Sequence, residues 1–333
     1  MQYHSFRDEN HITCLLCKHY CVIRDGKHGI CGINYNHGGE LVNITYNHPS
    51  TINLDPIEKK PLYHFLPNST SLSLGTVGCN FRCPFCQNHS ISQTTNVDKS
   101  IFYTPRDIVD LALSRGAKSI SYTYNEPTIW YQYAKDIGVL AKEAGLKNIF
   151  VSSGYESHEV LADMHSWLDG INVDLKSFDE EYYKKVLKTA LHGVLDSLVE
   201  LAKSPIHLEI TTLLIPQITL EQIEQMAEFI ALNLGLDIPW HFSAFFPNYK
   251  MLDDEPTLPE MLLKAVEIAR SYGIRYIYLG NVRYPNETRC YSCDNLLIDR
   301  AGYSAKIVGL DSGKCSRCGS EIAGVWSSDD RRS

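Results

Sequence analysis

The chain has 333 residues, 21% of them charged, and a formal net charge of -8. This acidic balance argues against a nucleic-acid-binding surface. The residues Met1–Asp8 lack the basic-then-apolar pattern of a signal peptide, and no later stretch is apolar for long enough to cross a bilayer. We therefore expect a cytoplasmic protein with no nucleic-acid or membrane partner, built as one large core with small appendages.

The first 68 residues show little helical periodicity and contain four closely spaced cysteines. Cysteines two residues apart, in a chain with an odd total of 11, favour metal ligands over disulfides. Residues 1–68 are thus predicted to form a loop-dominated module that holds zinc or an auxiliary iron–sulfur cluster, with His19 or His28 as alternative ligands. Three prolines predict an extended connector over Asp55–Pro67. The four cysteines are Cys14, Cys17, Cys21 and Cys31.

Residues 69–281 alternate short apolar runs with helical patterns. Repeated βα units of this kind predict an α/β fold, a partial or complete (β/α) barrel of the TIM type. Functional residues of such barrels lie at the C-terminal ends of the strands. The seven predicted strands are Ser71–Leu74, Ser119–Tyr124, Asn148–Val151, Ile171–Leu175, His207–Leu214, Trp240–Phe245 and Arg275–Leu279.

Three helices of this region carry start signals. Thr104 stands before a proline, Thr219 is followed three residues later by Gln222, and Thr257 by Glu260. A Thr side chain that precedes such residues is a typical N-cap. We expect the helices to begin directly after these threonines.

Three cysteines follow the first predicted strand with the spacing Cys79-x3-Cys83-x2-Cys86. Four thiolates would saturate a [4Fe-4S] cluster, whereas three leave one iron open to a ligand from solution. S-adenosylmethionine (SAM) can occupy that position, and its reductive cleavage gives a 5'-deoxyadenosyl radical that abstracts hydrogen from a substrate. The alternative is a zinc knuckle that lacks one ligand. We predict that these cysteines form the catalytic centre.

Residues 282–333 form a third unit, in which turns surround two more cysteine pairs. Two short pairs across a long gap are the pattern of a four-thiolate zinc ribbon. A segment this small buries too little apolar area to fold alone, so the metal would hold it together. A second iron–sulfur cluster is the alternative. The ligands are Cys290, Cys293, Cys315 and Cys318.

Taken together, these motifs resemble those of radical SAM enzymes, and most closely those of the AmmeMemoRadiSam system radical SAM enzymes, relatives of the pyruvate formate-lyase activating enzymes. The resemblance runs nearly end to end. One departure is in the segment after Trp240, where members of that family carry Arg and His and this chain has Ala244 and Phe246. The matching motifs are Cys14–Cys21, Asp55–Pro67, Gly78–Asn88, Tyr122–Thr128, Asn172–Lys176 and the C-terminal cysteine pairs.

The resemblance implies SAM contacts at the ends of the early strands. Asn125 and Glu126 would accept hydrogen bonds from the amino group of SAM, although Asn125 before a proline could simply be a helix N-cap. Ser153, with Ser152 beside it, would bind the SAM carboxylate or ribose, or else serve only as a turn residue. The backbone of Phe85 would meet the adenine, or its ring would only shield the cluster.

Asp174 and Lys176 complete the implied SAM site. Strand alternation places both side chains on one face, where Lys176 would attract the SAM carboxylate and Asp174 would orient it or the ribose. The simpler interpretation is a salt bridge at a strand end. Glu209 and Thr211 share a face of the next strand and are weaker candidates, and His241 is the best candidate on the substrate side.

Three functions are consistent with these motifs. The first is a radical SAM oxidoreductase that receives electrons from a flavodoxin or ferredoxin. The second is a glycyl-radical-enzyme activase that abstracts hydrogen from a partner protein; against it, the segment Leu72–Cys79 lacks the glycine- and arginine-rich lead-in of those activases. The third is a non-catalytic, metal-stapled scaffold for Memo-like and AMMECR-like proteins, partners that the family name implies. The intact cysteines argue against the scaffold.

Overall fold

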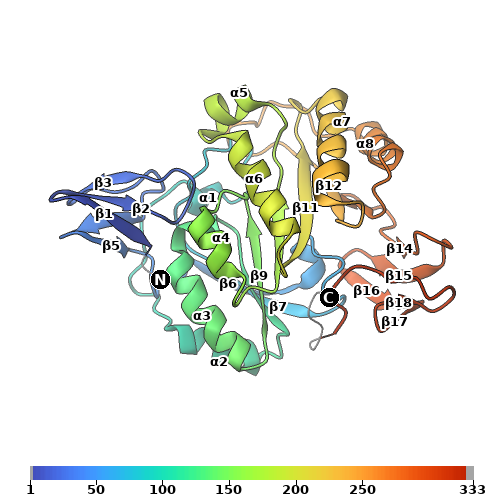
Figure 1. Cartoon of the computed structure of the whole chain (residues 1–333), viewed down its shortest axis with the longest axis horizontal. Coiled ribbons are helices and arrows are strands. Elements are labelled where there is room, and N and C mark those ends of the chain that lie inside the picture. Colours follow the sequence, from blue (N-terminus) through green and yellow to red (C-terminus); the bar gives the residue numbers. More distant parts are fainter. Residues whose placement is uncertain (1–2, 328–333) are drawn as a thin grey trace.

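The computed structural model describes residues 3–327. Figure 1 shows a central sheet with helices packed along it, small N-terminal strands at one end and small C-terminal strands at the other. In chain order, short strands with four cysteines come first, βα units follow, and short strands with four more cysteines come last.

The N-terminal region is built of short antiparallel strands and has no helix before η1 in its described residues. Strands β1 (His4–Asp8), β2 (His11–Cys14) and β3 (Val22–Arg24) form one sheet, and β4 (Asn34–His37) pairs with β5 (Glu40–Asn43). The turns between these strands carry the cysteines.

The central sheet contains all seven predicted strands in parallel and in chain order. An eighth strand, β6, pairs antiparallel with β7 and lies in the part of the chain that was predicted to be dominated by loops. Because β6 and β13 each have one partner within residues 3–327, the sheet is open and forms a partial barrel. The strands are β6 (Thr51–Pro56), β7 (Thr70–Gly75), β8 (Ser119–Tyr122), β9 (Lys147–Ser152), β10 (Gly170–Asp174), β11 (His207–Leu214), β12 (Trp240–Ala244) and β13 (Ile277–Gly280).

Helices connect the strands and bury one apolar face each. Thr104 caps α2 in a full capping box with Asp107, and Thr219 caps α7, as predicted. The third start was predicted one residue early, because the Thr257 hydroxyl bonds the backbone at Leu214 and Phe245 and α8 begins at Pro259. The helices are α1 (His89–Ser92), α2 (Pro105–Ser114), η2 (Pro127–Trp130), α3 (Tyr131–Glu143), α4 (His158–Met164), α5 (Glu180–Tyr182), η3 (Tyr183–Leu187), α6 (Leu191–Ala202), α7 (Leu220–Phe229), η4 (Ile230–Leu234) and α8 (Pro259–Ser271).

The connector after β6 packs against the interior of the partial barrel. It begins with the short helix η1 (Ile57–Lys59), and Leu62 and Phe65 are fully buried against Ile149 of β9. The backbone of Leu66 bonds the carbonyl of Val325, so the connector also pairs with the C-terminal tail. The connector that precedes the barrel core in the sequence and the tail that follows it therefore meet at the base of the barrel.

The C-terminal module is a set of short antiparallel strands that packs on the connector and on β13. Its apolar cluster includes Leu297 and Ile298 together with Tyr63 and Tyr278. Within residues 3–327, none of the helices has both the length and the apolar composition that crossing a membrane requires. The module's strands are β14 (Thr288–Arg289), β15 (Leu296–Ala301), β16 (Ser304–Ile307), β17 (Leu310–Asp311) and β18 (Lys314–Cys315).

Candidate active site

The loop that carries Cys79, Cys83 and Cys86 leaves the C-terminal end of β7 through two glycines. Gly78 has φ +88°, a left-handed conformation that favours glycine. Gly75 is needed for space, because a Cβ there would lie 2.6 Å from the carbonyl oxygen of Thr123. The ends of β7 and β8 are thus held in close contact directly before the cysteine loop.

Asn125 fixes the start of this loop with its side-chain amide. Its Nδ2 donates to the carbonyl of Gly78 at 2.9 Å and to the hydroxyl of Thr76 at 3.1 Å. Its Oδ1 accepts from the backbone N–H of Thr76 and from Nε1 of Trp130. A carboxamide has two N–H donors and two lone pairs on its oxygen, and in Asn125 all of them have partners. The structure therefore shows Asn125 as a clamp on the loop, while its contact with SAM stays a prediction.

Of the three loop cysteines, Cys79 and Cys83 are buried and Cys86 is partly exposed. Burial raises the pKa of the Cys79 thiol, and the nearby carboxylate of Glu126 raises it further. Burial also raises the pKa of Cys83, to about 12. Both of these thiols sense the charge of Cys86, whose sulfur lies 3.1 Å from the Ser92 hydroxyl. Proteins stabilise buried thiolates by metal coordination, so this cluster of thiols suits a cationic group.

Asp174 and Lys176 end β10 next to Cys83. Lys176 Nζ lies 2.8 Å from Asp174 Oδ2, which is the salt bridge of the simpler interpretation, while the contacts with SAM stay a prediction. Burial alone would lower the pKa of Lys176, but Asp174 and Cys83 together raise it. Asp174 is 38% exposed in its side chain, so it faces open space beside the cysteine loop.

Two buried hydroxyls near this pair have no hydrogen-bond partner within residues 3–327: those of Tyr182 and Thr211. Tyr182 senses the charge of Cys83, and Thr211 pairs in register with Asp174. Buried polar groups normally have partners. Unsatisfied hydroxyls beside a charged pair and a cysteine loop fit a polar ligand such as SAM at this place.

Glu126 lies at the end of β8 in a network with the end of β9. Its Oε1 accepts from the hydroxyls of Thr128 and Ser152, and its Oε2 accepts from the backbone N–H of Ser153 at 2.8 Å. Glu126, rather than Asn125, is the N-cap of η2. Burial and the charge of Glu126 raise the pKa of the neighbouring Glu156 to about 7. The two carboxyl groups thus form a buried acidic pair behind the cysteine loop.

The N-terminal cysteines lie close to one another, and their module contacts the loop that carries Cys79, Cys83 and Cys86. Burial raises the pKa of Cys14 to about 12 and that of Cys17 well above its usual range, and the charges of the neighbouring cysteines add to both shifts. His19 Nε2 lies 3.1 Å from the carbonyl of Asn80, and a Cβ on Gly78 would lie 3.0 Å from the carbonyl of Cys31. The N-terminal module therefore packs directly on the cysteine loop.

Of the three cysteine groups, the C-terminal one has its sulfur atoms closest together. The sulfurs of Cys290, Cys293, Cys315 and Cys318 all lie within 4.8 Å of one another, which suits a single metal ion. Neither of the other two cysteine groups is gathered this closely in residues 3–327. Hydrogen bonds with Ser320 lower the pKa of Cys318 to about 6, which favours its thiolate as a ligand.

The structure also gives the positions of three more residues that were named from the sequence. Phe85 is buried between Cys83 and Cys86. At the end of β12, Ala244 is buried and Phe246 is 50% exposed, so neither offers a polar group. The departure from the resembled family, noted in the sequence, thus leaves this loop without a polar side chain at either position.

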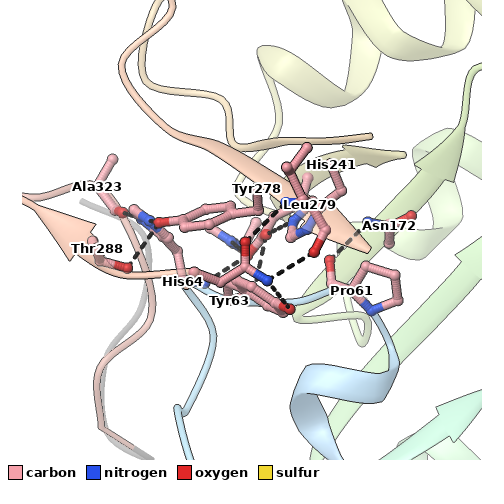
Figure 2. A network of polar contacts seen from close by, with 12 residues as sticks. Pro61, Tyr63, His64, Asn172, His241, Tyr278, Leu279, Thr288 and Ala323 are labelled. Atoms are coloured by element: carbon pink, nitrogen blue, oxygen red, sulfur yellow. Dashed lines mark hydrogen bonds and ion pairs between the residues drawn. The ribbon is translucent and has the colours of Figure 1, made fainter. Parts of the chain in front are cut away.

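A second polar network was not predicted from the sequence, although Glu209 and His241 were each noted as candidates. The fully buried Glu209 accepts hydrogen bonds from Nε2 of His207 and of His241. It also accepts from the backbone N–H groups of Tyr63 and His64. Figure 2 shows the rings of Tyr63, His64, Tyr278 and His241 gathered in this network.

This network explains how Glu209 remains charged at the centre of the molecule. Burial alone would raise the pKa of Glu209, but the hydrogen bonds from His207 and His241 hold it well below its usual range. With four donors around it, the carboxylate has no lone pair left for SAM. Glu209 therefore belongs to the base of the partial barrel rather than to the SAM site.

Comparison with known proteins decides the family. The family model "Radical SAM superfamily" matches residues 73–230. An uncharacterised protein of Methanocaldococcus jannaschii is 38% identical over 324 residues, which cover 95% of this chain and 96% of that protein. The chain belongs to the radical SAM superfamily. The superfamily match contains the cysteine loop and the ends of β8, β9 and β10, where the site residues lie.

Two further proteins are similar to this radical SAM protein over a smaller part of the chain. A second Methanocaldococcus jannaschii protein, named as a candidate glycyl-radical enzyme activating enzyme, is 27% identical over 210 residues, covering 61% of this chain and 78% of that protein. The structure of Streptococcus suis SuiB bound to the precursor peptide SuiA matches with a TM-score of 0.51 and 13% identity, over 68% of this chain and 52% of that one. At this identity the SuiB match shows the shared fold alone.

Proposed function

We propose that this radical SAM protein is an oxidoreductase that holds a [4Fe-4S] cluster with Cys79, Cys83 and Cys86 and binds SAM at the open iron. When bound, the cluster and SAM together supply a 5'-deoxyadenosyl radical for hydrogen abstraction. The observation that carries the proposal is the position of the cysteine loop, at the C-terminal edge of a parallel sheet inside the matched family region. This edge is where barrel enzymes bind their substrates.

The residues of the chain would divide the work of holding SAM. Glu126 would accept the amino group, since its Oε2 has room for a second donor besides Ser153. Lys176 would face the carboxylate, and Asp174 the ribose or the carboxylate. Ser153 and the backbone of Phe85 would complete the contacts to the ribose and adenine. The unsatisfied hydroxyl of Tyr182 supports a polar ligand in this space.

The two flanking cysteine groups are proposed as metal centres. For the C-terminal group we favour zinc: tetrahedral Zn–S bonds of about 2.3 Å place sulfurs about 3.8 Å apart. The Cys290–Cys318 and Cys293–Cys315 sulfur distances are 3.6 and 3.7 Å. For Cys14, Cys17, Cys21 and Cys31 we propose zinc or an auxiliary cluster.

Two further attributes belong to the proposal on the basis of family resemblance alone. They are membership of the AmmeMemoRadiSam system with Memo-like and AMMECR-like partners, and a flavodoxin or ferredoxin as reductant. A cytoplasmic location is proposed because cysteines that serve as metal ligands suit a reducing compartment. The same resemblance supplies the scaffold alternative, in which those partners bind a protein that no longer cleaves SAM.

A glycyl-radical-enzyme activase is the second candidate function. The similarity to the protein named as a glycyl-radical enzyme activating enzyme favours it. In that case the substrate would be a glycine in a partner protein, and the partner would acquire a stable radical signal after incubation with SAM and reductant.

The experiment that tests the proposal is reductive cleavage of SAM. Anaerobically reconstituted protein with dithionite and SAM should release 5'-deoxyadenosine, and Cys83→Ser should abolish the release. A matched control is Cys318→Ser, which removes a thiolate from the C-terminal group and leaves the loop intact. Reconstituted protein that binds iron in the loop but releases no 5'-deoxyadenosine would support the scaffold alternative.

A further inference from the structure

A cleft of about 780 Å³ lies at the open side of the partial barrel. One wall is β12 and β13 with the segment that follows β13, the second is the connector at residues 58–63, and the third is the hairpin of β15 and β16 in the C-terminal module. The volume falls in the range of ligand sites, about 300–1,000 Å³. The cleft is thus assembled from three parts of the chain that are distant in sequence.

His241 presents an oriented nitrogen to this cleft. Its Nε2 lies 2.6 Å from Glu209 Oε2, and because an ionised carboxylate only accepts, Nε2 carries the hydrogen. In the neutral ring this leaves Nδ1 as a hydrogen-bond acceptor, with no partner of its own in residues 3–327. The edge-on contact with the Tyr63 ring, at 4.7 Å between centroids, fixes the plane of the imidazole. Glu209 therefore acts as a positioning residue for His241.

The second wall supplies a buried carboxylate, Glu58, and the third wall supplies a buried cation, Arg300. Arg300, of β15, is 4% exposed and stacks on Tyr63 at 4.6 Å, and Glu58 is 2% exposed. Arg300 Nε and Glu58 Oε2 have no partners within residues 3–327, and no ion pair joins the two side chains. The Nη groups of Arg300 already donate to the Thr288 hydroxyl and to the Tyr63 carbonyl, so Arg300 is a fixed part of its wall. Arg300 Nε and Glu58 Oε2 leave one donor and one acceptor beside the cleft, which suits a ligand with both.

The charges of the cleft balance, which favours a neutral polar ligand over an ion. Exposed tyrosines, Tyr284 and Tyr303, add flat surfaces for a planar group. The acidic lining residues are Glu58, Glu287 and Asp299, and the basic ones are Lys59, Arg283 and Arg300.

One residue that lines the cleft, His241, lies on the same register level of the sheet as the end of β10. Asp174, Thr211 and His241 are register partners on successive strands. Since neighbouring strands lie about 4.8 Å apart, His241 is about 10 Å from Asp174 across the sheet. That separation fits a small group bound at His241 that extends toward the cysteine loop.

We propose that this cleft binds the substrate of the radical chemistry through a carboxamide group, with Nδ1 of His241 accepting its N–H and with Arg300 of the C-terminal module forming the facing wall. The inference rests on the proposed function, because it assigns a substrate class to that reaction. A carboxamide is neutral, planar, and carries both a donor and an acceptor. It follows that the metal module at the C-terminus is part of the binding site.

The test is binding of carboxamide probes to the reconstituted protein. Saturation-transfer NMR with acetamide as a free amide and N-acetylglycinamide as a peptide unit should detect binding of one or both, and acetate should not bind. The amide that binds more tightly indicates whether the carboxamide of the substrate belongs to a small molecule or to a peptide segment. Loss of the acceptor in His241→Phe should weaken binding about tenfold, the equivalent of one hydrogen bond. His158→Gln, at an exposed histidine that also pairs with a glutamate, is the matched control and should bind as the wild type does.

A second measurement does not depend on variants. Crystals of the wild-type protein soaked with N-acetylglycinamide should show the amide against His241. Protein that cleaves SAM but binds neither amide, or that binds them equally well in His241→Phe, would overturn the cleft assignment alone. Protein that fails to cleave SAM would overturn the proposed function instead, so the two failures are distinguishable.

Discussion

At the scale of single residues, the spacing of the cysteines predicted their grouping, but not the side chains that hold them. Asn125 reaches a carbonyl 47 residues earlier in the chain, and Glu209 accepts from a backbone N–H 145 residues away. No local pattern encodes such distant hydrogen bonds. Strand alternation indicated only that Glu209 lies on one face of its strand, and it led to a SAM role that the structure does not support.

The clamp formed by Asn125 leads to a first prediction. Asn125→Ala removes every hydrogen bond of this side chain and leaves buried backbone groups at Thr76 and Gly78 unpaired, which should cost about 1–3 kcal/mol of stability. The cysteine loop should also lose iron on reconstitution. Melting temperature and iron content measure both effects, with the exposed Asn233→Ala as the control. Unchanged iron content would show that the loop holds its shape without the clamp.

His64 leads to a prediction about acid stability. Its Nδ1 donates to the carbonyl of Ala323 and its Nε2 accepts from the Tyr278 hydroxyl, so the buried ring is neutral. Burial lowers the pKa of His64 to about 3. An unfolded histidine takes up a proton below about pH 6.5, so stability should fall as the pH drops from about 6.5 to 3, by up to about 1.4 kcal/mol per pH unit.

The variant that isolates this effect is His64→Gln. It should be less stable than the wild type at pH 7, since it loses one buried contact, yet lose less stability on acidification. Denaturant unfolding at several pH values between 7 and 5 measures the slope, and His158→Gln provides an exposed histidine as the control. Parallel slopes for His64→Gln and the wild type would contradict the assignment of a neutral ring.

At the scale of elements, periodicity predicted the seven parallel strands because each has a short apolar run between helical segments. Strand β6 was missed because residues 1–68 were predicted to be dominated by loops, whereas its pairing depends on β7, which lies later in the chain. The start of α8 was placed at Thr257 because the cap signal is local, while the hydroxyl is used by two distant backbone groups. Tertiary contacts explain both misses.

The C-terminal module leads to a prediction at this scale. Its strands are two to six residues long, and its stability should depend on the metal at the four cysteines. A chelator should therefore raise hydrogen exchange in β14–β18 while β11 keeps its protection. Equal protection of both regions after complete metal removal, measured by mass spectrometry, would show that the module folds without its ion.

At the scale of the whole molecule, the chain combines three groups of cysteines with different geometries. The C-terminal group closes around one site, and the N-terminal group packs on the loop of the middle one. The middle group is the one with three cysteines. It lies at the C-terminal edge of the parallel sheet. This arrangement, and the match to the radical SAM superfamily, make the open iron the central claim.

Electron paramagnetic resonance of the anaerobically reconstituted, dithionite-reduced protein tests this claim most directly. A Cys290→Ser variant, which leaves the loop unchanged, separates the signal of the loop from any cluster at the C-terminus. Addition of SAM should shift the signal of the reduced cluster in both proteins, because SAM binds the iron itself. A spectrum that stays identical with and without SAM would contradict the account.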